Sequence, residues 1–389
     1  MRELGALLNQ YQNILGTLEK KYLAPCIEAC RSIASGTIFQ SQTVLQAKQI
    51  LNILGGSEAD WQDWKWQQRN RINNSTVLAE ILELSDLERK RIDKVGRVYQ
   101  WAVTPYYLSL VGRNYQSSPI YKQVVPDVWE LASEGTVNQN NLARSCPAPC
   151  ITRKRPNQAV LNVTNQCAAI CRHCSKRRKT GILDKHAPSW DIARALNYIR
   201  KNKDIHEVVI GGGDGLLLND QAIDWILDQL HRMPHIETKR ISTRVPVTLP
   251  QRITPKLCDI LRRYPPINIT IQFNHPQEVT LEARRACEML AQAGILLRNQ
   301  TVLLKGVNNN PAVIKRLNHL LVQIKVRPKY ILQSRDVNGT RHFQTDAEEG
   351  LSIMEALRSS ERLVPAYIPR NQDRPGNIKT ADANPWKDA

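Results

Sequence analysis

The chain has 389 residues, of which 42% are hydrophobic and 23% are charged, and it carries a formal net charge of +18 at pH 7. This length allows one large domain or a core domain with appendages, and the composition provides for a hydrophobic core of ordinary size. No apolar run approaches the ~20 residues that span a bilayer, and the first residues lack the compact apolar block of a secretory signal. An odd count of 9 cysteines disfavours a disulfide framework and favours a reducing cytoplasm.

Residues 1–115 are predicted to form a helical N-terminal region. Apolar residues recur at three- and four-residue spacing in 43–54 and 76–95, and Ser85 is placed to cap a helix. Tryptophans at 61, 64 and 66 are interpreted as aromatic packing between helices. Residues 116–157 are richer in Pro, Ser and Asn and are interpreted as a linker.

From residue 158 onward, short β-rich runs alternate with helical stretches. The predicted strands are 159–164, 207–212, 239–245, 267–273, 296–304 and 327–333, and the helices between them include 189–203, 219–233, 278–292 and 311–323. This alternation predicts an α/β fold with a parallel sheet and right-handed crossovers, curled into a full or partial barrel over 158–365. Residues 366–389 form the remaining C-terminal tail.

Chemistry in such folds lies at the carboxyl ends of the strands. The residues that fall there are Cys167, Gly211 to Asp214, Arg244, His275 and Gln300. Cys167, Cys171 and Cys174 follow the first barrel strand. A structural zinc site would need a fourth ligand, and incidental thiols are the other simple interpretation. An iron–sulfur cluster held by three thiolates would leave one iron open for chemistry.

The Cys-x-x-x-Cys-x-x-Cys spacing on this loop, with "GGGD" at 211–214 after the second strand, resembles the radical S-adenosylmethionine (radical SAM) enzymes. Longer stretches resemble the lysine 2,3-aminomutase family within it, over about residues 55 to 360. They are "WQDWKWQQRNRI", "CRHCSKRR", "RVPVTLPQRIT", "FNHPQEVTLEARRACEMLAQAGILLRNQTVLLKGVNNN" and "VRPKYILQSRDVNGTRHFQT".

The resemblance implies a partial (β/α)6 barrel whose [4Fe-4S] cluster is bound by Cys167, Cys171 and Cys174. It implies that SAM is bound by residues that include Gly212, Gly213, Asp214, Arg244 and Gln300. The reduced cluster of such enzymes cleaves SAM to a 5′-deoxyadenosyl radical, which abstracts hydrogen from the substrate. A reductase or flavodoxin-type protein would supply the electron, and a homo-oligomer is an open alternative to a monomer.

The family also uses pyridoxal phosphate (PLP), because a saturated ammonium offers no π bond to a neighbouring radical and the cofactor supplies one. The PLP lysine of the family lies in a glycine-rich stretch near the C-terminus. Its best match here is Lys379 in "RPGNIKT", where most of those glycines are missing. The phosphate-binding arginine of the family corresponds to Gln158, which brings no charge. PLP use therefore stays open.

The residues that would meet the distal end of the substrate also depart from the family. Two aspartates that hold the ammonium of lysine correspond to Asn309 and Arg335, and the arginine for the α-carboxylate corresponds to Lys176. A buried Arg335 would repel a cationic side chain and bind a carboxylate. The substrate is therefore predicted to be an amino acid other than lysine, with an anionic or neutral distal group.

The resulting prediction is a cytoplasmic radical SAM 2,3-aminomutase that acts on an amino acid other than lysine. One alternative is a PLP-independent radical SAM enzyme that performs oxidation, elimination or epimerisation. The other is an RNA-associated iron–sulfur protein that uses the basic runs at 153–155 and 176–179. Basic residues beside the cluster serve cofactor and substrate anions in this family, so no nucleic-acid partner is expected. Cys146 and Cys150 are interpreted as incidental thiols.

Overall fold

The computed structural model describes residues 36–112, 114–131, 146–176, 184–361 and 363–369. One sheet organises them, with strands in the order β1-β2-β3-β4-β5-β6-β7-β8. The strands are β1 Ile151–Arg155, β2 Gln158–Thr164, β3 Glu207–Gly212, β4 Thr238–Thr243, β5 Ile267–Ile271, β6 Leu296–Leu303, β7 Arg327–Gln333 and β8 Ala366–Ile368.

Every neighbouring pair from β2 to β8 is parallel, and β1 is antiparallel to β2. The six predicted strands correspond to β2–β7, so the predicted parallel α/β sheet is confirmed. The helices of this unit are α11 Ser189–Lys201, α12 Asp220–His231, α13 Val245–Thr248, α14 Pro255–Arg262, α15 Leu281–Gln292, α16 Pro311–Gln323 and α17 Ala347–Arg358.

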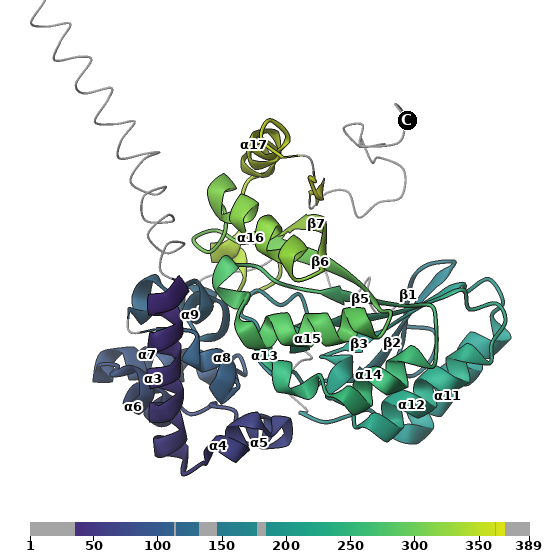
Figure 1. Cartoon of the computed structure of the whole chain (residues 1–389), viewed down its shortest axis with the longest axis horizontal. Helices are drawn as coiled ribbons and strands as arrows, with labels where there is room; N and C mark the ends of the chain where they lie inside the picture. The colour runs from purple at the N-terminus through teal and green to yellow at the C-terminus, as the bar shows by residue number, and fades with distance from the viewer. Residues whose placement is uncertain (1–35, 113, 132–145, 177–183, 362, 370–389) are drawn as a thin grey trace, which may run out of the picture.

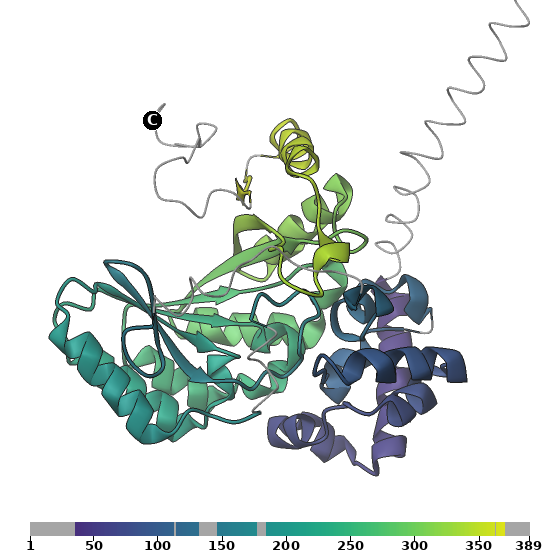
Figure 2. The ribbon, with the colours of Figure 1, turned by 180° about the vertical axis from the view of Figure 1, so that it is seen from behind.

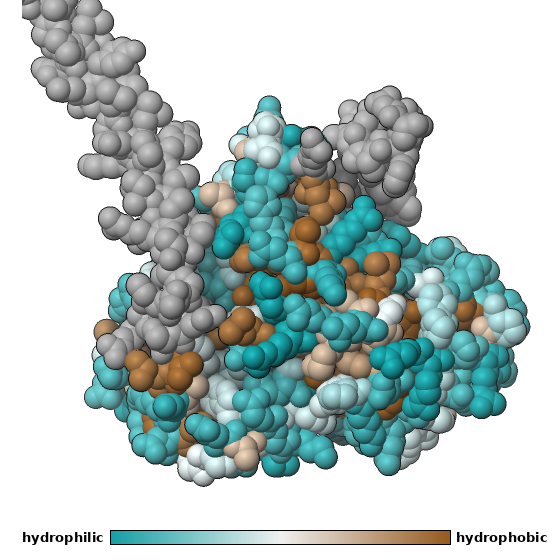
Figure 3. Space-filling view, in the orientation of Figure 1, coloured by the Kyte–Doolittle hydropathy of each residue, from teal (hydrophilic) through white to brown (hydrophobic). Residues whose placement is uncertain are grey.

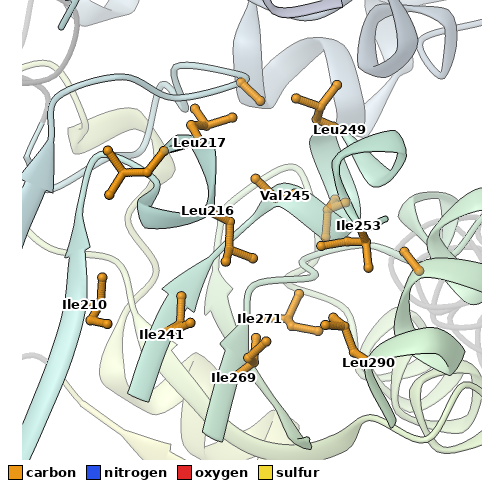
Figure 4. Packing of buried hydrophobic residues seen from close by; sticks show 14 of the residues in the cluster. Ile210, Leu216, Leu217, Ile241, Val245, Leu249, Ile253, Ile269, Ile271 and Leu290 are labelled. Atoms are coloured by element: carbon orange, nitrogen blue, oxygen red, sulfur yellow. The ribbon is translucent and has the colours of Figure 1, made fainter. Parts of the chain in front are cut away.

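Helices lie along one face of the sheet, and the opposite face is seen without a helical layer when the molecule is turned round (Figures 1 and 2). Alternate strand residues follow this arrangement. Ile210, Ile241 and Ile269 point into the helix-covered side, where they pack with Leu290 of α15 in one continuous core (Figure 4). Their neighbours Ser242 and Asn268 are only half buried. The uncovered face of the sheet is therefore the polar one.

The N-terminal region is helical, as predicted. Its helices are α3 Gly36–Leu54, α4 Glu58–Gln62, α5 Trp64–Arg69, α6 Ser75–Leu82, α7 Asp86–Gly96, α8 Pro105–Ser109 and α9 Pro119–Val124. Ser85 caps α7 in a capping box with Glu88, as expected. The stretch 76–95 breaks into two helices at Glu83, which adopts a left-handed conformation with φ 55°. Trp66 is buried and Trp61 and Trp64 pack against the core, in agreement with the packing interpretation.

The structure differs from the predicted elements in three places. The range 116–157 contains α9 and β1. The tail from 366 onward begins with β8, a strand of three residues. Helix α15 starts at Leu281 and not at 278, because the Thr280 side chain caps it. The domain boundaries themselves stay predictions.

The surface in the view of Figure 1 is largely hydrophilic, with smaller groups of apolar residues between (Figure 3). Such a distribution is ordinary for a folded domain. Within the described ranges, no helix combines the length and the apolar character that crossing a bilayer requires.

Candidate active site

The three cysteines lie on the loop that follows β2, and all three are partly buried. The Cys174 amide donates to the Cys171 carbonyl at 3.1 Å, which closes a turn between them. Burial raises the pKa of Cys167 well above its ordinary value, and the nearby charges of Cys174, Asp214 and Cys171 raise it further. The three sulfurs therefore lie within electrostatic reach of one another.

This donor set fits an iron–sulfur cluster better than a single metal ion. No three Cys, His, Asp or Glu side chains in the part of the chain described here converge on a point that one ion could occupy. In a cluster each thiolate binds a different iron, so the sulfurs need not converge. A metal would also stabilise the thiolate of Cys167, which burial otherwise disfavours. Cys146 and Cys150 precede β1 and lie outside this loop.

The N-terminal region holds the cysteine loop in place. The Ile170 amide donates to the Ala102 carbonyl at 2.9 Å, and the Arg172 amide donates to the Gln123 carbonyl at 2.8 Å. The Arg71 guanidinium donates to the Cys167 carbonyl at 2.8 Å. The loop is thus fixed at Cys167, Ile170 and Arg172 by residues far away in sequence.

The side chain of Arg172 makes the strongest of these anchors. Its guanidinium pairs with both carboxylate oxygens of Glu130 and donates to the Gln100 carbonyl at 2.9 Å. The side chains of Arg172 and Glu130 are 1% and 0% exposed. Because neither charge reaches water, each is stabilised in the interior by the opposite charge of the other.

Glycines at the end of β3 let the start of the cysteine loop approach closely. Gly212 has φ +116°, and a Cβ built there would lie 2.4 Å from the Thr164 carbonyl oxygen. A Cβ on Gly213 would lie 2.1 Å from the Gln166 carbonyl oxygen. The Gly213 amide donates to the Thr164 carbonyl at 2.6 Å. These glycines, which the sequence assigned to SAM, position the loop in this structure.

We expect Gly213→Ala to displace the cysteine loop, because the contacts that the new methyl group would meet are backbone atoms that cannot rotate away. The overpacking should cost about 1–3 kcal/mol of unfolding free energy and remove most of the iron bound after reconstitution. Thermal unfolding and iron and sulfide content measure both effects. Gly211→Ala is the matched control, because a Cβ there meets nothing within 4 Å. Full iron content in Gly213→Ala would contradict this role.

Asp214 ties the end of β3 to the end of β4. Its carboxylate accepts hydrogen bonds from the Thr243 hydroxyl at 2.6 Å and from the Arg244 amide at 2.7 Å. A third comes from the Leu216 amide at 3.2 Å. Burial raises the pKa of Asp214, while these hydrogen bonds act in the opposite direction. The carboxylate that was predicted to bind SAM therefore already accepts hydrogen bonds from other residues of the protein.

Arg244, also predicted to bind SAM, is buried and points at the cysteine loop. Its Nη1 lies 2.7 Å from Cys171 Sγ, and its Nη2 lies 2.7 Å from Glu278 Oε1. The Nη2 atom also lies 3.0 Å from the Tyr107 hydroxyl and 3.2 Å from Gln123 Oε1. Sequence reasoning missed Glu278, Tyr107 and Gln123 as parts of the site.

The ends of β5 and β6 carry further polar groups, and one of them contacts the cysteine loop. His173 Nε2 lies 2.9 Å from Nε2 of Gln272, which follows β5. Burial lowers the pKa of His275 to about 3, so its imidazole is neutral, and its Nδ1 accepts the Gln277 amide at 3.2 Å. Gln300 lies on β6 beside Tyr330 of β7 and is half buried. Its side chain makes no hydrogen bond to another described residue and is the freest of the predicted SAM residues.

The residues predicted to bind the substrate lie at the same end of the sheet but are less enclosed than expected. Arg335 is exposed on the loop after β7, which corrects the expectation of a buried arginine. Lys176 is exposed, and its Nζ donates to the Gly212 carbonyl at 3.1 Å. Asn309 accepts the Gly306 amide at 2.8 Å and donates to Glu349 Oε1 at 2.6 Å. Asn309 thus joins its own loop to the first turn of α17.

Of the two positions that the family resemblance assigns to PLP, only Gln158 lies within the described residues. Gln158 lies at the amino end of β2, where its amide donates to Glu207 Oε2 at 2.5 Å. Glu207 also pairs with Arg240 at 3.1 Å, so that arginine is neutralised. Position 158 therefore offers no free cation to a phosphate group. Lys379 lies outside the described residues.

Comparison with known proteins agrees with this geometry. The model of the radical SAM superfamily matches residues 161–316. The glutamate 2,3-aminomutase of Clostridioides difficile is 43% identical over 88% of this chain and 82% of its own length. The L-lysine 2,3-aminomutase of Fusobacterium nucleatum is 40% identical over 82% of this chain and 76% of its own.

Among solved structures, that of Streptococcus suis SuiB bound to S-adenosylmethionine aligns with 55% of this chain and 51% of its own. The two share 16% sequence identity, and the TM-score is 0.43.

Proposed function

The chain belongs to the radical SAM family of amino-acid 2,3-aminomutases, and from that membership we propose that it moves the α-amine of an acidic amino acid to C3. Glutamate and aspartate are the substrates that this proposal favours. The observation that carries it is Arg335, a cation at the carboxyl end of β7, which the family resemblance matches to an aspartate of lysine-specific members.

Three thiolates on the loop after β2 would hold the cluster, and the open iron with SAM would supply the radical that takes hydrogen from C3. The protein contributes the position of this loop. Arg71 fixes it from the N-terminal region, and Gly213 fixes it from the end of β3. The loop that carries the cysteines thereby lies at the carboxyl ends of the strands, where Lys176 and Arg335 would present cationic groups to a substrate with two carboxylates.

The side chains near the predicted distal pocket support an anionic substrate. Asn309 occupies the position of the other aspartate of lysine-specific members, and it is neutral. The carboxylate nearest to it, Glu349, accepts a hydrogen bond from the Asn309 amide. Arg335 is exposed on the loop after β7, and its neighbour Asp336 is buried and accepts the Gln344 side-chain amide at 2.6 Å. A cation exposed at this strand end would steer a substrate carboxylate by its charge.

The substrate is tested by incubating reconstituted enzyme, SAM and reductant with glutamate, aspartate, alanine, lysine and arginine, with and without PLP. Chromatography of the β-amino products measures turnover. The proposal expects the highest kcat/KM on an acidic amino acid. Lysine as the best substrate would refute it.

We expect Arg335→Asp to reduce kcat/KM on an acidic substrate on the order of 10–100-fold, because a charged hydrogen bond is lost and a repulsion takes its place. Alanine turnover should fall much less. The matched control is Arg341→Asp, which reverses another exposed cation on the same loop. Equal losses on acidic and neutral substrates would mean that Arg335 acts structurally.

We propose PLP as a cofactor, held through Lys379, because the amine shift requires the π bond that it supplies. Chemical assay of cofactor released from purified protein tests this directly. If no PLP is found and no β-amino product forms with any substrate, while SAM is still cleaved, the result would favour a PLP-independent radical SAM enzyme. A low-potential reductase or flavodoxin-type protein is the proposed electron donor, and the cytoplasm is the proposed compartment. RNA is not a proposed substrate.

A further inference from the structure

The guanidinium of Arg244 lies directly against one of the three cysteine sulfurs. Arg244 follows β4, and its Nη1 is 2.7 Å from Cys171 Sγ. The arginine side chain is 10% exposed. A hydrogen bond from a buried cation to sulfur is stronger than one made in water, because little solvent screens it.

Glu278 fixes Arg244 in this position. Its Oε1 accepts from Arg244 Nη2 at 2.7 Å and from the Tyr107 hydroxyl at 2.6 Å. Its Oε2 accepts the amides of Asn274 and His275. The Gln123 side-chain amide also donates to Oε1, at 3.0 Å, so five donors hold the carboxylate and it cannot follow the guanidinium if that moves.

The remaining contacts of Arg244 leave it little freedom. Its Nε donates to the Gln272 carbonyl at 3.2 Å, and Nη2 also contacts Tyr107 and Gln123. A side chain held at Nε, Nη1 and Nη2 is poorly placed to reach out to SAM. Its position instead allows Arg244 to donate a hydrogen bond to the sulfur of Cys171.

We propose that Arg244 is a positioning residue that raises the reduction potential of the cluster through its hydrogen bond to Cys171, with Glu278 holding it there. The proposal rests on the three cysteines binding a [4Fe-4S] cluster and does not depend on which amino acid is the substrate. Hydrogen bonds to the sulfurs and local charge are among the factors that set such potentials.

The direction of the effect follows from the charges. A [4Fe-4S]²⁺ cluster with three thiolates carries a total charge of −1, and one electron from an external reductant makes it −2. A fixed cation at a ligand sulfur stabilises the more negative form. Arg244 therefore favours the reduced cluster, which is the form that cleaves SAM.

The test is the midpoint potential of the cluster in Arg244→Gln, measured without substrate by electron paramagnetic resonance during titration with dithionite. We expect the equilibrium constant for reduction to fall about tenfold or more, which is ~59 mV for a one-electron couple. Iron content should stay at the wild-type level. An unchanged or higher potential in a fully loaded variant would overturn the proposal.

Arg244→Lys decides the question if Arg244→Gln fails to load the cluster. It keeps a positive charge but loses the fork that bonds sulfur and Glu278 together, so a smaller fall of the potential is expected. A wild-type potential in Arg244→Lys would then overturn the proposal. Arg252→Gln is the matched control. It removes another buried arginine, which pairs with Asp220 at 2.8 Å, and it should leave the potential where it is.

Discussion

Replacing any one of Cys167, Cys171 and Cys174 by alanine is expected to abolish SAM cleavage. Each thiolate fills the coordination of one iron, and two remaining protein ligands do not retain a cluster with a single open iron. The measurement is 5′-deoxyadenosine formed under anaerobic, reducing conditions, together with the iron and sulfide content of each variant. We expect the product to fall below detection in all three.

Cys146→Ala is the control for these variants. Cys146 is exposed and precedes β1, so its loss should change neither iron content nor SAM cleavage. A triple variant at 167, 171 and 174 that still formed 5′-deoxyadenosine would remove the cluster assignment and every proposal that rests on it. A loss of iron in Cys146→Ala would instead point to an accessory cluster.

The strands of the barrel were predictable from sequence because each is a short β-branched run between amphipathic helices. Ile269 and Ile271 in β5 show this pattern, and they are buried against the helices. Strand β1 was missed because it is an edge strand with the sequence "ITRKR". Cations on an edge strand face solvent on one side, so the run resembles a linker. Pro156 and Asn157, interpreted as linker residues, form the turn between β1 and β2.

The cluster cysteines could be predicted from sequence because all three lie within one short loop. The residues that surround them in the folded chain could not be predicted. Arg244 contacts Glu278 across 34 positions and Tyr107 across 137. No local pattern marks such a pair, since the fold alone brings the residues together. Asp214 and Gly213 were identified as important, but the structure gives them positions in the scaffold of the site. Gly213 permits the cysteine loop to pack closely against the end of β3, and the buried carboxylate of Asp214 joins β3 to β4.

The sequence predicted a helical region over 1–115 and a linker over 116–157, yet both supply groups that bind the cysteine loop. Glu130, Gln123 and Tyr107 all lie before the first barrel strand, and each contacts a residue of the site. A loop that carries a cluster has few backbone hydrogen bonds of its own, so its position must be fixed from outside. The buried pair of Arg172 and Glu130 is the clearest test of that role.

Glu130→Ala is expected to lower the free energy of unfolding by ~3–5 kcal/mol, because it leaves the guanidinium of Arg172 buried without its counter-charge. The two side chains are 1% and 0% exposed, so water cannot replace the lost carboxylate. Iron content after reconstitution should fall with stability, since Arg172 lies between two of the cysteines. Urea denaturation and iron assay measure the two effects.

Two comparison variants separate the buried charge from a general loss of contacts. Asp259→Ala breaks an exposed pair with Arg262, whose side chains are 68% and 59% exposed, and should cost below about 1 kcal/mol. Glu130→Ala combined with Arg172→Met removes both charges and should be more stable than Glu130→Ala alone, because no buried charge is left without a partner. If the double variant were less stable than the single one, the apolar packing of the Arg172 side chain, and not its charge, would be what holds the cysteine loop.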